Sequence, residues 1–269
     1  MNILITGAGK RIGKDIAINF AKLGVNIILH YNNSKTEANN TKKEIDKYGK
    51  AILIKANLEN SKSVKKLFSD AKKKLGKIHH LINCASLFEN DDLLKFNEKS
   101  WNKHININAK APAILISNFA NQKLQSKDNP TITNILDQRV FKLTPYFFSY
   151  TVSKMILFNL TKTSAMRLAP KIRVNAIAPG PVIKNSRQSE SHFKKQYQNT
   201  LLKKQVNKKE IFSACKFFIE NQSITGQSIA VDSRTVRDVQ SRLKEAVQRA
   251  IALSLDDQKG SEGRKGSEG

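Results

Sequence analysis

Short apolar runs alternate with amphipathic stretches along most of the chain. Runs such as "LIN" and "ILI" lack the polar alternation of a one-sided strand, which is typical of strands covered on both faces. The candidate strands are residues 2–6, 25–31, 50–58, 79–85, 131–137, 172–179 and 227–232, and the helical patterns lie near 12–23, 35–48, 61–75, 99–125, 150–169 and 208–220. Repeated strand–helix units with right-handed crossovers predict an α/β fold, a Rossmann-type doubly wound parallel sheet of seven strands.

Residues 233–269 differ in composition from the rest of the chain. Asparagine is absent there, arginine displaces lysine, and "KGSEG" occurs twice. Residues 236–255 are predicted as an amphipathic helix, and the end is predicted as a disordered polar tail. We therefore expect a single domain over 1–232, followed by an atypical C-terminal tail.

The net charge of +25 raises the question of a nucleic-acid partner. The lysines are spread over every predicted helix without a compact basic block, so we expect no specific nucleic acid, although anionic ligands are still attracted. No apolar run approaches the roughly 20 residues of a bilayer span, and "NILIT" is typical of a first strand rather than a signal peptide. Since Cys84 and Cys215 are too few for a disulfide framework, we expect a cytoplasmic protein that does not bind a membrane.

The stretch "TGAGKRIG" lies between the first predicted strand and the first helix. Gly7, Gly9 and Gly13 allow a tight turn and a close approach to a pyrophosphate, and the helix N-terminus offers free N–H groups to anionic oxygens. The spacing is G-x-G-x-x-x-G rather than G-x-G-x-x-G, and a purely structural turn is the alternative. Its place at the first strand–helix junction favours a dinucleotide-binding turn.

The end of the second strand bears on which dinucleotide binds. An NAD site places a carboxylate there, but "HYNNSK" has no acid before Glu37. Donors and cations for a 2′-phosphate are present instead: Asn33, Ser34, Lys10, Arg11 and Lys35. This pattern favours NADPH over NADH, with an ordinary polar loop as the alternative.

A candidate catalytic pair occurs in "SYTVSK". Tyr150 and Lys154 stand at i and i+4, which puts both side chains on one face of a helix. An ammonium beside a phenol is expected to lower the pKa of the phenol toward working pH, so that the tyrosine can act as a general acid. Taken alone, this spacing is common and typical of a solvated helix face.

Together with the glycine turn, the pair resembles the short-chain dehydrogenase/reductase family over about residues 1–232. Four further stretches resemble the family's motifs in the same order: "NCAS" (83–86), "HININAKAP" with Asn108, "VNAIAPGPV" (174–182) and "ITGQSIAVD" (224–232). The resemblance implies that Lys154 holds the nicotinamide ribose and that Asn108 keeps a helix bulge and a water in place. It also implies a homotetramer, or a dimer, built on the long helices near 99–125 and 150–169.

Within that family, Asp137 stands where most members have a serine, 13 residues before Tyr150. With an aspartate at this position, the chain resembles pteridine reductases and bacterial dihydromonapterin reductases. The chain shares three further features with them: "KR" in the first turn, "HY" in the second strand, and Phe88. The resemblance implies NADPH-dependent reduction of a dihydropterin such as dihydromonapterin or dihydrobiopterin, with dihydrofolate as an open case. Tyr150 and Asp137 would then supply the proton, Phe88 would stack on the pterin, and Arg11 would bridge pterin and cofactor phosphate.

These inferences assign individual residues. Catalysis is assigned to Tyr150, Lys154, Asp137 and Asn108. Cofactor binding is assigned to Gly7, Gly9, Lys10, Arg11, Ile12, Gly13, His30, Tyr31, Asn32, Asn33, Ser34, Asn57, Leu58, Asn83, Ala85, Lys154, Pro179, Gly180 and Val182. Substrate binding is assigned to Arg11, Ser86, Phe88, Asp137 and Tyr150, and no metal site is expected.

Alternatives stay open at this point. Asp137 can be a capping residue, Phe88 can pack in a core or lid, and Ser86 can be a small residue where glycine is usual. A carbonyl reductase such as a 3-oxoacyl-thioester reductase is the rival activity, although Asp137 in place of serine argues against it. A non-catalytic NADPH-binding or nucleic-acid-binding protein is the rival from another class. The tail keeps this rival open, because Arg234 stands where family members have glycine.

Overall fold

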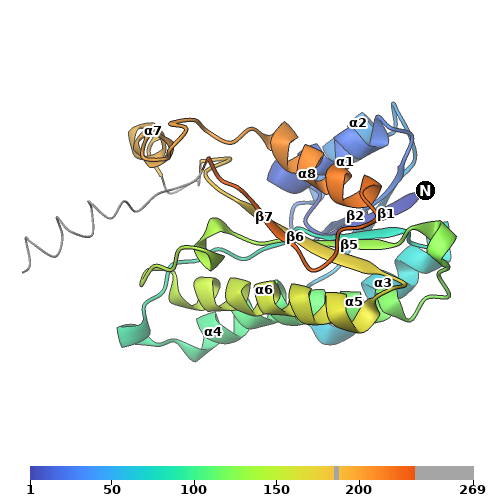
Figure 1. Cartoon of the computed structure of the whole chain (residues 1–269), viewed down its shortest axis with the longest axis horizontal. Coiled ribbons are helices and arrows are strands. Elements are labelled where there is room, and N and C mark those ends of the chain that lie inside the picture. Colours follow the sequence, from blue (N-terminus) through green and yellow to red (C-terminus); the bar gives the residue numbers. More distant parts are fainter. Residues whose placement is uncertain (185–187, 234–269) are drawn as a thin grey trace, which may run out of the picture.

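A seven-stranded, all-parallel sheet forms the centre of the protein (Figure 1). The computed structural model describes residues 1–184 and 188–233, so the predicted tail, with Arg234 and the helix near 236–255, lies outside the described residues. The strand order is β3-β2-β1-β4-β5-β6-β7, which confirms the predicted doubly wound sheet. The strands are β1 (Asn2–Ile5), β2 (Asn26–Tyr31), β3 (Ala51–Lys55), β4 (His80–Asn83), β5 (Thr131–Ile135), β6 (Arg173–Pro179) and β7 (Ser228–Val231).

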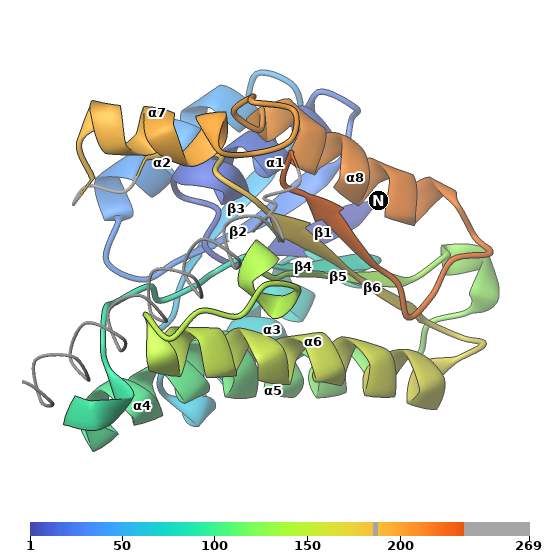
Figure 2. The same cartoon turned by 60° about the vertical axis from the view of Figure 1, so that its left-hand side comes forward.

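Helices cover both faces of the sheet, as Figures 1 and 2 show. The helices α1 (Arg11–Ala21), α2 (Lys35–Ile45) and α8 (Lys208–Glu220) lie on one face. The other face carries α3 (Ser61–Leu75), α4 (Glu98–Ile105), α5 (Ala111–Ala120) and α6 (Phe148–Leu168). A further helix, α7 (Glu190–Gln198), projects beyond the sheet, and short turns η1 (Leu93–Lys95), η3 (Ser126–Asp128) and η4 (Gln138–Val140) lie in the loops.

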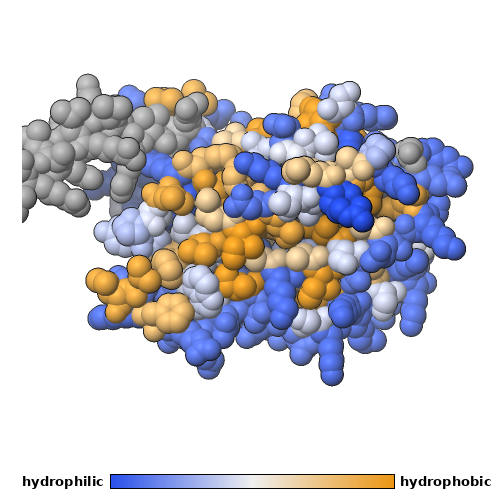
Figure 3. All heavy atoms as spheres, turned by 60° about the horizontal axis from the view of Figure 1, so that its bottom comes forward, coloured by the Kyte–Doolittle hydropathy of each residue, from blue (hydrophilic) through white to orange (hydrophobic). Residues whose placement is uncertain are grey.

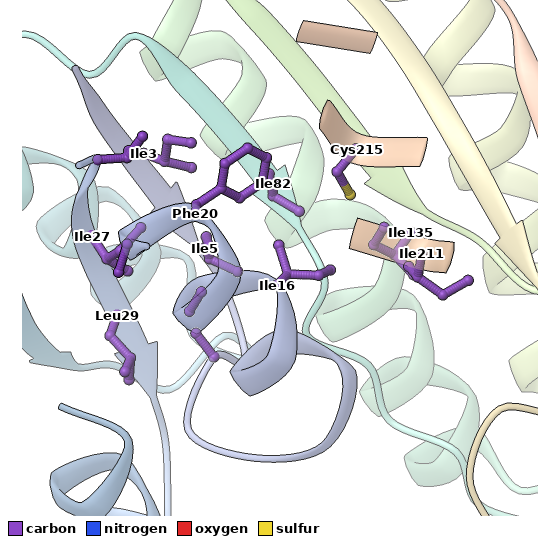
Figure 4. Close-up of a cluster of buried hydrophobic side chains, with 14 of the residues drawn as sticks. Ile3, Ile5, Ile16, Phe20, Ile27, Leu29, Ile82, Ile135, Ile211 and Cys215 are labelled. Atoms are coloured by element: carbon purple, nitrogen blue, oxygen red, sulfur yellow. The ribbon is translucent and has the colours of Figure 1, made fainter. Parts of the chain in front are cut away.

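The core follows from the two-residue period of the strands. In β1, Ile3 and Ile5 belong to the cluster under α1 and α8, whereas Leu4 belongs to the cluster on the opposite face. All three are fully buried, as strands covered on both faces require. Figure 4 shows the first cluster, where Phe20 of α1 and Cys215 of α8 meet the strands. Cys215 is thus fully buried on the apolar face of α8.

Several predicted boundaries are wrong. The strands expected at 50–58, 79–85 and 131–137 end at Lys55, Asn83 and Ile135, because the following residues leave the ladder to form loops. The single helix expected near 99–125 is interrupted by a π-helical turn, η2 (Asn106–Lys110), and its last residues are not helical. Helix α7 was missed because it buries only Phe193 and so shows little apolar periodicity.

The arrangement positions a site at one edge of the sheet. All strands are parallel, so the loops after β1, β2, β4, β5 and β6 leave from the same edge. The order of the strands reverses between β1 and β4, and ligands of open α/β sheets bind outside the carboxyl ends at such a switch point. Many of the candidate residues lie in these loops or at the strand ends before them, whereas Tyr150 and Lys154 lie on α6 and Asn108 lies in η2.

The outer surface over the lower helix layer is not uniformly polar. Apolar side chains gather among charged ones on the face turned forward in Figure 3. On α6, Ile156 is 41% exposed and Met166 is 81% exposed. Among the described residues, no helix is both long and apolar enough to cross a bilayer.

Candidate active site

His30 binds the backbone of the glycine turn that follows β1. The N–H groups of Gly7 and Ala8 donate to Nδ1 and to the carbonyl of His30, each at 3.0 Å. Because Nδ1 accepts, Nε2 carries the ring proton and donates to the carbonyl of Ala56 at 3.1 Å. Burial lowers the pKa of His30 to about 4 and keeps the ring neutral.

His30 thus has a structural role in the turn, and its assigned contact with a cofactor stays a prediction. Its ring is 2% exposed and both of its nitrogens are bonded within the protein. The side chains of Tyr31 and Leu58, also assigned to the cofactor, are buried too, at 8% and 6% exposure. All three side chains are thus packed within the protein, and the cofactor contacts assigned to these residues stay predictions.

The turn has no room for side chains at its glycines. A Cβ on Gly7, whose φ is +67°, would lie 2.8 Å from Cα of Ala85. A Cβ on Gly13 would lie 2.4 Å from the carbonyl oxygen of Gly7. Helix α1 follows with no side-chain cap at Lys10 and no acidic residue in its first turn. Its free N–H groups and its dipole therefore suit an anionic group held against the turn.

Arg11 adopts a conformation that normally favours glycine. Its φ is +55°, and a non-glycine residue in this region costs of order 1 kcal/mol. Its guanidinium donates to the carbonyls of Ile183 and Lys184, at 3.4 and 3.3 Å, in the loop after β6. Arg11 therefore joins the glycine turn to the opposite wall of the site.

The remaining candidates for the cofactor lie around this turn. Asn33 is exposed, Ile12, Asn32 and Ser34 are half-buried, and a Cβ on Gly9 would lie 3.2 Å from Oγ of Ser34. The Asn57 side chain accepts from the N–H of Glu59 at 3.0 Å. The polar atom Oδ1 of Asn83 is buried without a partner among the described residues, although its Nδ2 donates to Asn134 at 2.8 Å.

The wall formed by β6 is backbone. Gly180 donates its N–H to the carbonyl of Val231 at 2.9 Å, and a Cβ there would lie 2.5 Å from Cα of Asp232. Pro179 and Val182 flank it and are buried. This close approach of two chain segments explains the glycine that the sequence shows at this position.

Tyr150 and Asp137 meet at the end of β5. The phenol, 5% exposed on α6, donates to Oδ2 of Asp137 at 2.8 Å. The other oxygen, Oδ1, accepts from the N–H of Arg139 at 2.9 Å and so caps the short η4 turn. Asp137 thus caps the turn and also binds the tyrosine, and its assigned role in catalysis stays a prediction.

The ionisation of the pair differs from the sequence-based prediction. The pKa of Tyr150 is raised well above its ordinary value, first by burial and then by the Asp137 carboxylate, while Arg139 and the Ser86 hydroxyl act in the opposite direction. The expectation that Lys154 lowers this pKa is wrong, because its ammonium lies 5.8 Å from the Tyr150 ring centroid and donates to the carbonyl of Ile135 at 2.8 Å. The phenol is therefore neutral and carries a proton.

Lys154 is buried beside the same loop. It is 2% exposed, and burial lowers its pKa to about 8, with Asp137 acting in the opposite direction. Cys84 is intermediate in exposure as a residue, but burial of its thiol raises the pKa of that group to about 11. A buried ammonium with one carbonyl partner has further donors for hydroxyl groups of a ligand.

Asn108 holds the centre of the site together. Its Nδ2 donates to the carbonyl of Leu87 and to Oγ of Ser153, each at 2.9 Å, and its Oδ1 accepts from the N–H of Leu87 at 2.8 Å. The residue is fully buried in the π-helical turn, so the helix bulge that the family resemblance implied is present. Ser86 is exposed beside it, and its hydroxyl lies 3.3 Å from Oδ1 of Asn108.

Aromatic rings line the side of Tyr150 away from the sheet. Phe88 is half-buried, stacks on Phe147 at a centroid distance of 4.5 Å and meets Tyr150 edge-on at 4.6 Å. The guanidinium of Arg139 lies 5.3 Å from the ring of Phe88. Phe147 and Arg139 were missed from the sequence; the only signal was their closeness to Tyr150 and Asp137 in the chain.

Asp91, also missed, fixes the start of α6. Its Oδ1 accepts from the N–H of Ser149 at 3.0 Å, and its Oδ2 accepts from the hydroxyl of Ser100 at 2.9 Å. The loop after β4, helix α4 and helix α6 are thereby tied at one point. These bonds fix the position of Ser149 and so of Tyr150, the next residue on α6.

The edge of the sheet thus offers an anion-binding turn and, beside it, a buried phenol that carries a transferable proton. An open α/β sheet with both features is the architecture of the dinucleotide-dependent oxidoreductases. The chain belongs to one family of that class, the short-chain dehydrogenases/reductases: residues 7–233 match the family described as enoyl-(acyl carrier protein) reductase.

Similar proteins include two kinds of reductase. The FolM alternative dihydrofolate reductase 1 from Brucella suis, solved in complex with NADP, is 38% identical with a TM-score of 0.83, covering 87% of this chain and 94% of that one. Its counterpart from Brucella canis, also complexed with NADP, is 37% identical with a TM-score of 0.80, covering 87% and 93%. The 3-oxoacyl-[acyl-carrier-protein] reductase FabG of Staphylococcus epidermidis is 28% identical over 235 residues, covering 85% of this chain and 96% of that protein.

Proposed function

We propose that the protein is an NADPH-dependent reductase of dihydropterins, with dihydromonapterin, dihydrobiopterin and dihydrofolate as the candidate substrates. The observation that carries the proposal is the 2.8 Å hydrogen bond from the Tyr150 phenol to the Asp137 carboxylate. Similarity to the two Brucella proteins described as alternative dihydrofolate reductases supports the same substrate class.

The residues of the turn fit a dinucleotide phosphate. The crowded glycines, the uncapped start of α1 and the cation of Arg11 together suit the pyrophosphate. Asn33 and Ser34 offer donors to a 2′-phosphate, and the absence of a carboxylate between His30 and Lys35 favours NADPH over NADH. Lys154 keeps donors for the hydroxyls of the nicotinamide ribose. When bound, NADPH supplies the hydride.

Reduction of a ring C=N bond also requires a proton at nitrogen, and the neutral Tyr150 phenol is placed to deliver it. Asp137 holds the hydroxyl group in one orientation, since the phenol donates to Oδ2. After transfer, the carboxylate and burial both favour return of a proton to the phenolate. Phe88 offers a flat face for the pterin ring, and the exposed Ser86 hydroxyl offers a hydrogen bond at the rim.

The test is NADPH oxidation with 7,8-dihydromonapterin, dihydrobiopterin and dihydrofolate, run beside acetoacetyl thioester. We expect turnover of at least one dihydropterin with kcat/KM about 100-fold above that of the thioester, since the site is flat and aromatic. The Asp137→Ser variant should lose pterin turnover while its NADPH affinity stays unchanged. Turnover of the thioester alone would contradict the proposal.

The second candidate is a 3-oxoacyl-thioester reductase. It is favoured by the similarity to the Staphylococcus epidermidis FabG protein. The same assay decides between the two, because a thioester reductase gains from Asp137→Ser and a pterin reductase does not. NADPH binding without turnover of either substrate class would support the third candidate, a non-catalytic NADPH-binding protein.

The predicted homotetramer, or dimer, stays a prediction. The exposed Ile156 and Met166 on α6 are the kind of side chains that an interface between two copies would cover. Sedimentation velocity of the full chain tests this, and a monomer at all concentrations would contradict it.

A further inference from the structure

Arg139 forms an ion pair with Asp137, the partner of Tyr150. It lies in η4, two residues after Asp137. Its N–H donates to Oδ1 at 2.9 Å, and its Nη1 lies 3.3 Å from both Oδ1 and Oδ2. The carboxylate that accepts the hydrogen bond of Tyr150 is therefore also held by this residue.

The same guanidinium also lies against the aromatic rings. Its central carbon is 5.3 Å from the ring centroid of Phe88, 5.1 Å from that of Phe147 and 6.0 Å from that of Tyr150. A planar cation attracts ring faces at such distances, and with 20% of its side chain exposed Arg139 has little freedom to leave. Phe147 keeps its place although its φ is +58°, a strained value for a bulky residue.

One buried hydrogen-bond donor of Arg139, its Nε, has no partner within the described residues 1–184 and 188–233. A buried donor without a partner is rare in native proteins, because its desolvation is not compensated. The guanidinium lies on the aromatic side of Tyr150, where the proposed substrate ring would stack.

We propose that Arg139 is a positioning and specificity residue: its Nη1 holds the Asp137 carboxylate against Tyr150, and its Nε donates to an acceptor atom of a flat heterocyclic substrate. This inference rests on the proposed function, since it takes the substrate to be a pterin. Pterin rings carry carbonyl and ring-nitrogen acceptors in the ring plane, whereas an acyl thioester has no such ring. A rigid planar donor beside two phenyl rings therefore selects for the heterocycle.

The experiment compares three variants of the full chain: Arg139→Gln, Arg139→Lys and, as a matched control, Arg167→Gln at an exposed position of α6. For Arg139→Gln we expect kcat/KM for the dihydropterin to fall about 100-fold, through a lower kcat and a higher KM. Arg139→Lys keeps a cation near Asp137 but loses Nε, so kcat should recover to within about 10-fold while KM for the pterin stays raised by about 10-fold. The affinity for NADPH should stay unchanged in all three variants.

Binding without turnover supplies a second measurement. Trp101, the single tryptophan of the chain, stacks on Phe148 at 5.7 Å, close to the start of α6. Quenching of its fluorescence by a dihydropterin, at saturating NADP⁺, gives a dissociation constant that we expect Arg139→Gln to raise about 10-fold and Arg167→Gln to leave unchanged.

The outcomes separate the two proposals. A wild-type protein that neither binds nor reduces any dihydropterin overturns the proposed function and this inference with it. A wild-type protein that reduces dihydropterins while Arg139→Gln behaves like Arg167→Gln overturns this inference alone. Should Arg139→Gln fail to bind NADPH, Arg139→Lys decides: an unchanged KM for the pterin overturns the inference, and a raised one supports it.

Discussion

Arg11 and Phe147 are both non-glycine residues in the left-handed region, with φ of +55° and +58°, but the protein holds them by different means. Around Arg11 the constraint is backbone: glycines that cannot carry a Cβ and a buried His30 that binds two successive N–H groups. Around Phe147 the constraint is side chains from separate elements, namely its ring stack with Phe88 and the nearby cation of Arg139. The cofactor region is thus constrained through its backbone, and the catalytic region through contacts between side chains.

The largest effect that tests this division is expected for Tyr150→Phe. Removing the hydroxyl abolishes the proton donor but keeps the ring that packs on Phe88, so turnover should fall by about 10²–10⁴-fold. Affinity for NADPH should stay within about twofold, because no contact of the glycine turn involves Tyr150. Steady-state rates and a fluorescence titration with NADPH measure the two effects. A parallel loss of NADPH affinity would show that the two regions act as one.

The same division explains what the sequence could predict. The seven strands, the glycine turn and the i, i+4 pair follow from local pattern, and so these predictions agree with the structure. The charge state of Tyr150 could not be predicted, because it depends on burial and on where the ammonium of Lys154 points. Arg139 stood in the sequence two residues from Asp137, but only the fold brings it to the rings of Phe88 and Phe147.

Acid should weaken the cofactor region through His30. The pKa of its ring is about 4 in the folded protein and about 6.5 when exposed, so the unfolded chain takes up a proton that the native state refuses. Stability is therefore full above pH 6.5 and falls as the pH drops toward 4, by about 3 kcal/mol from this residue. Urea unfolding at pH 8 and pH 4 measures the loss.

A pair of variants isolates that contribution. In His30→Gln the amide can replace both hydrogen bonds without a titrating group, so about 3 kcal/mol of the acid loss should disappear. His80, whose pKa is lowered to about 3 by burial, keeps its own share of the acid dependence in both proteins. The exposed His192 on α7 serves as the control, and His192→Gln should lose as much stability between pH 8 and pH 4 as wild type. If His30→Gln loses as much stability in acid as wild type, protonation of His30 does not cause that loss.

A smaller effect is expected from Gly13→Ala. The new Cβ would lie 2.4 Å from the carbonyl of Gly7, so the turn must shift, at a cost of about 2 kcal/mol in stability. NADPH affinity should fall about 10-fold, while kcat at saturating NADPH stays near wild type. The control is Gly24→Ala, where φ is +77° and nothing lies within 4 Å, so that only backbone strain is added. A reduced kcat at saturation would mean that the turn also shapes the catalytic region.

The smallest and sharpest effect is expected from Arg11→Gly. Glycine adopts a φ of +55° without strain, so the relief exceeds the added chain entropy and stability should rise by about 0.5 kcal/mol. The bonds to the carbonyls of Ile183 and Lys184 are lost along with the cation, so KM for NADPH and for the substrate should each rise several-fold. Lys203→Gly is the matched control, because Lys203 is exposed with a φ of +47° and should gain stability without any change in KM. If Arg11→Gly is stabilised while both KM values stay unchanged, the strained backbone of Arg11 makes no contribution to ligand binding. The turn and the catalytic region would then differ in their structural constraints but not in a separate contribution of Arg11 to binding.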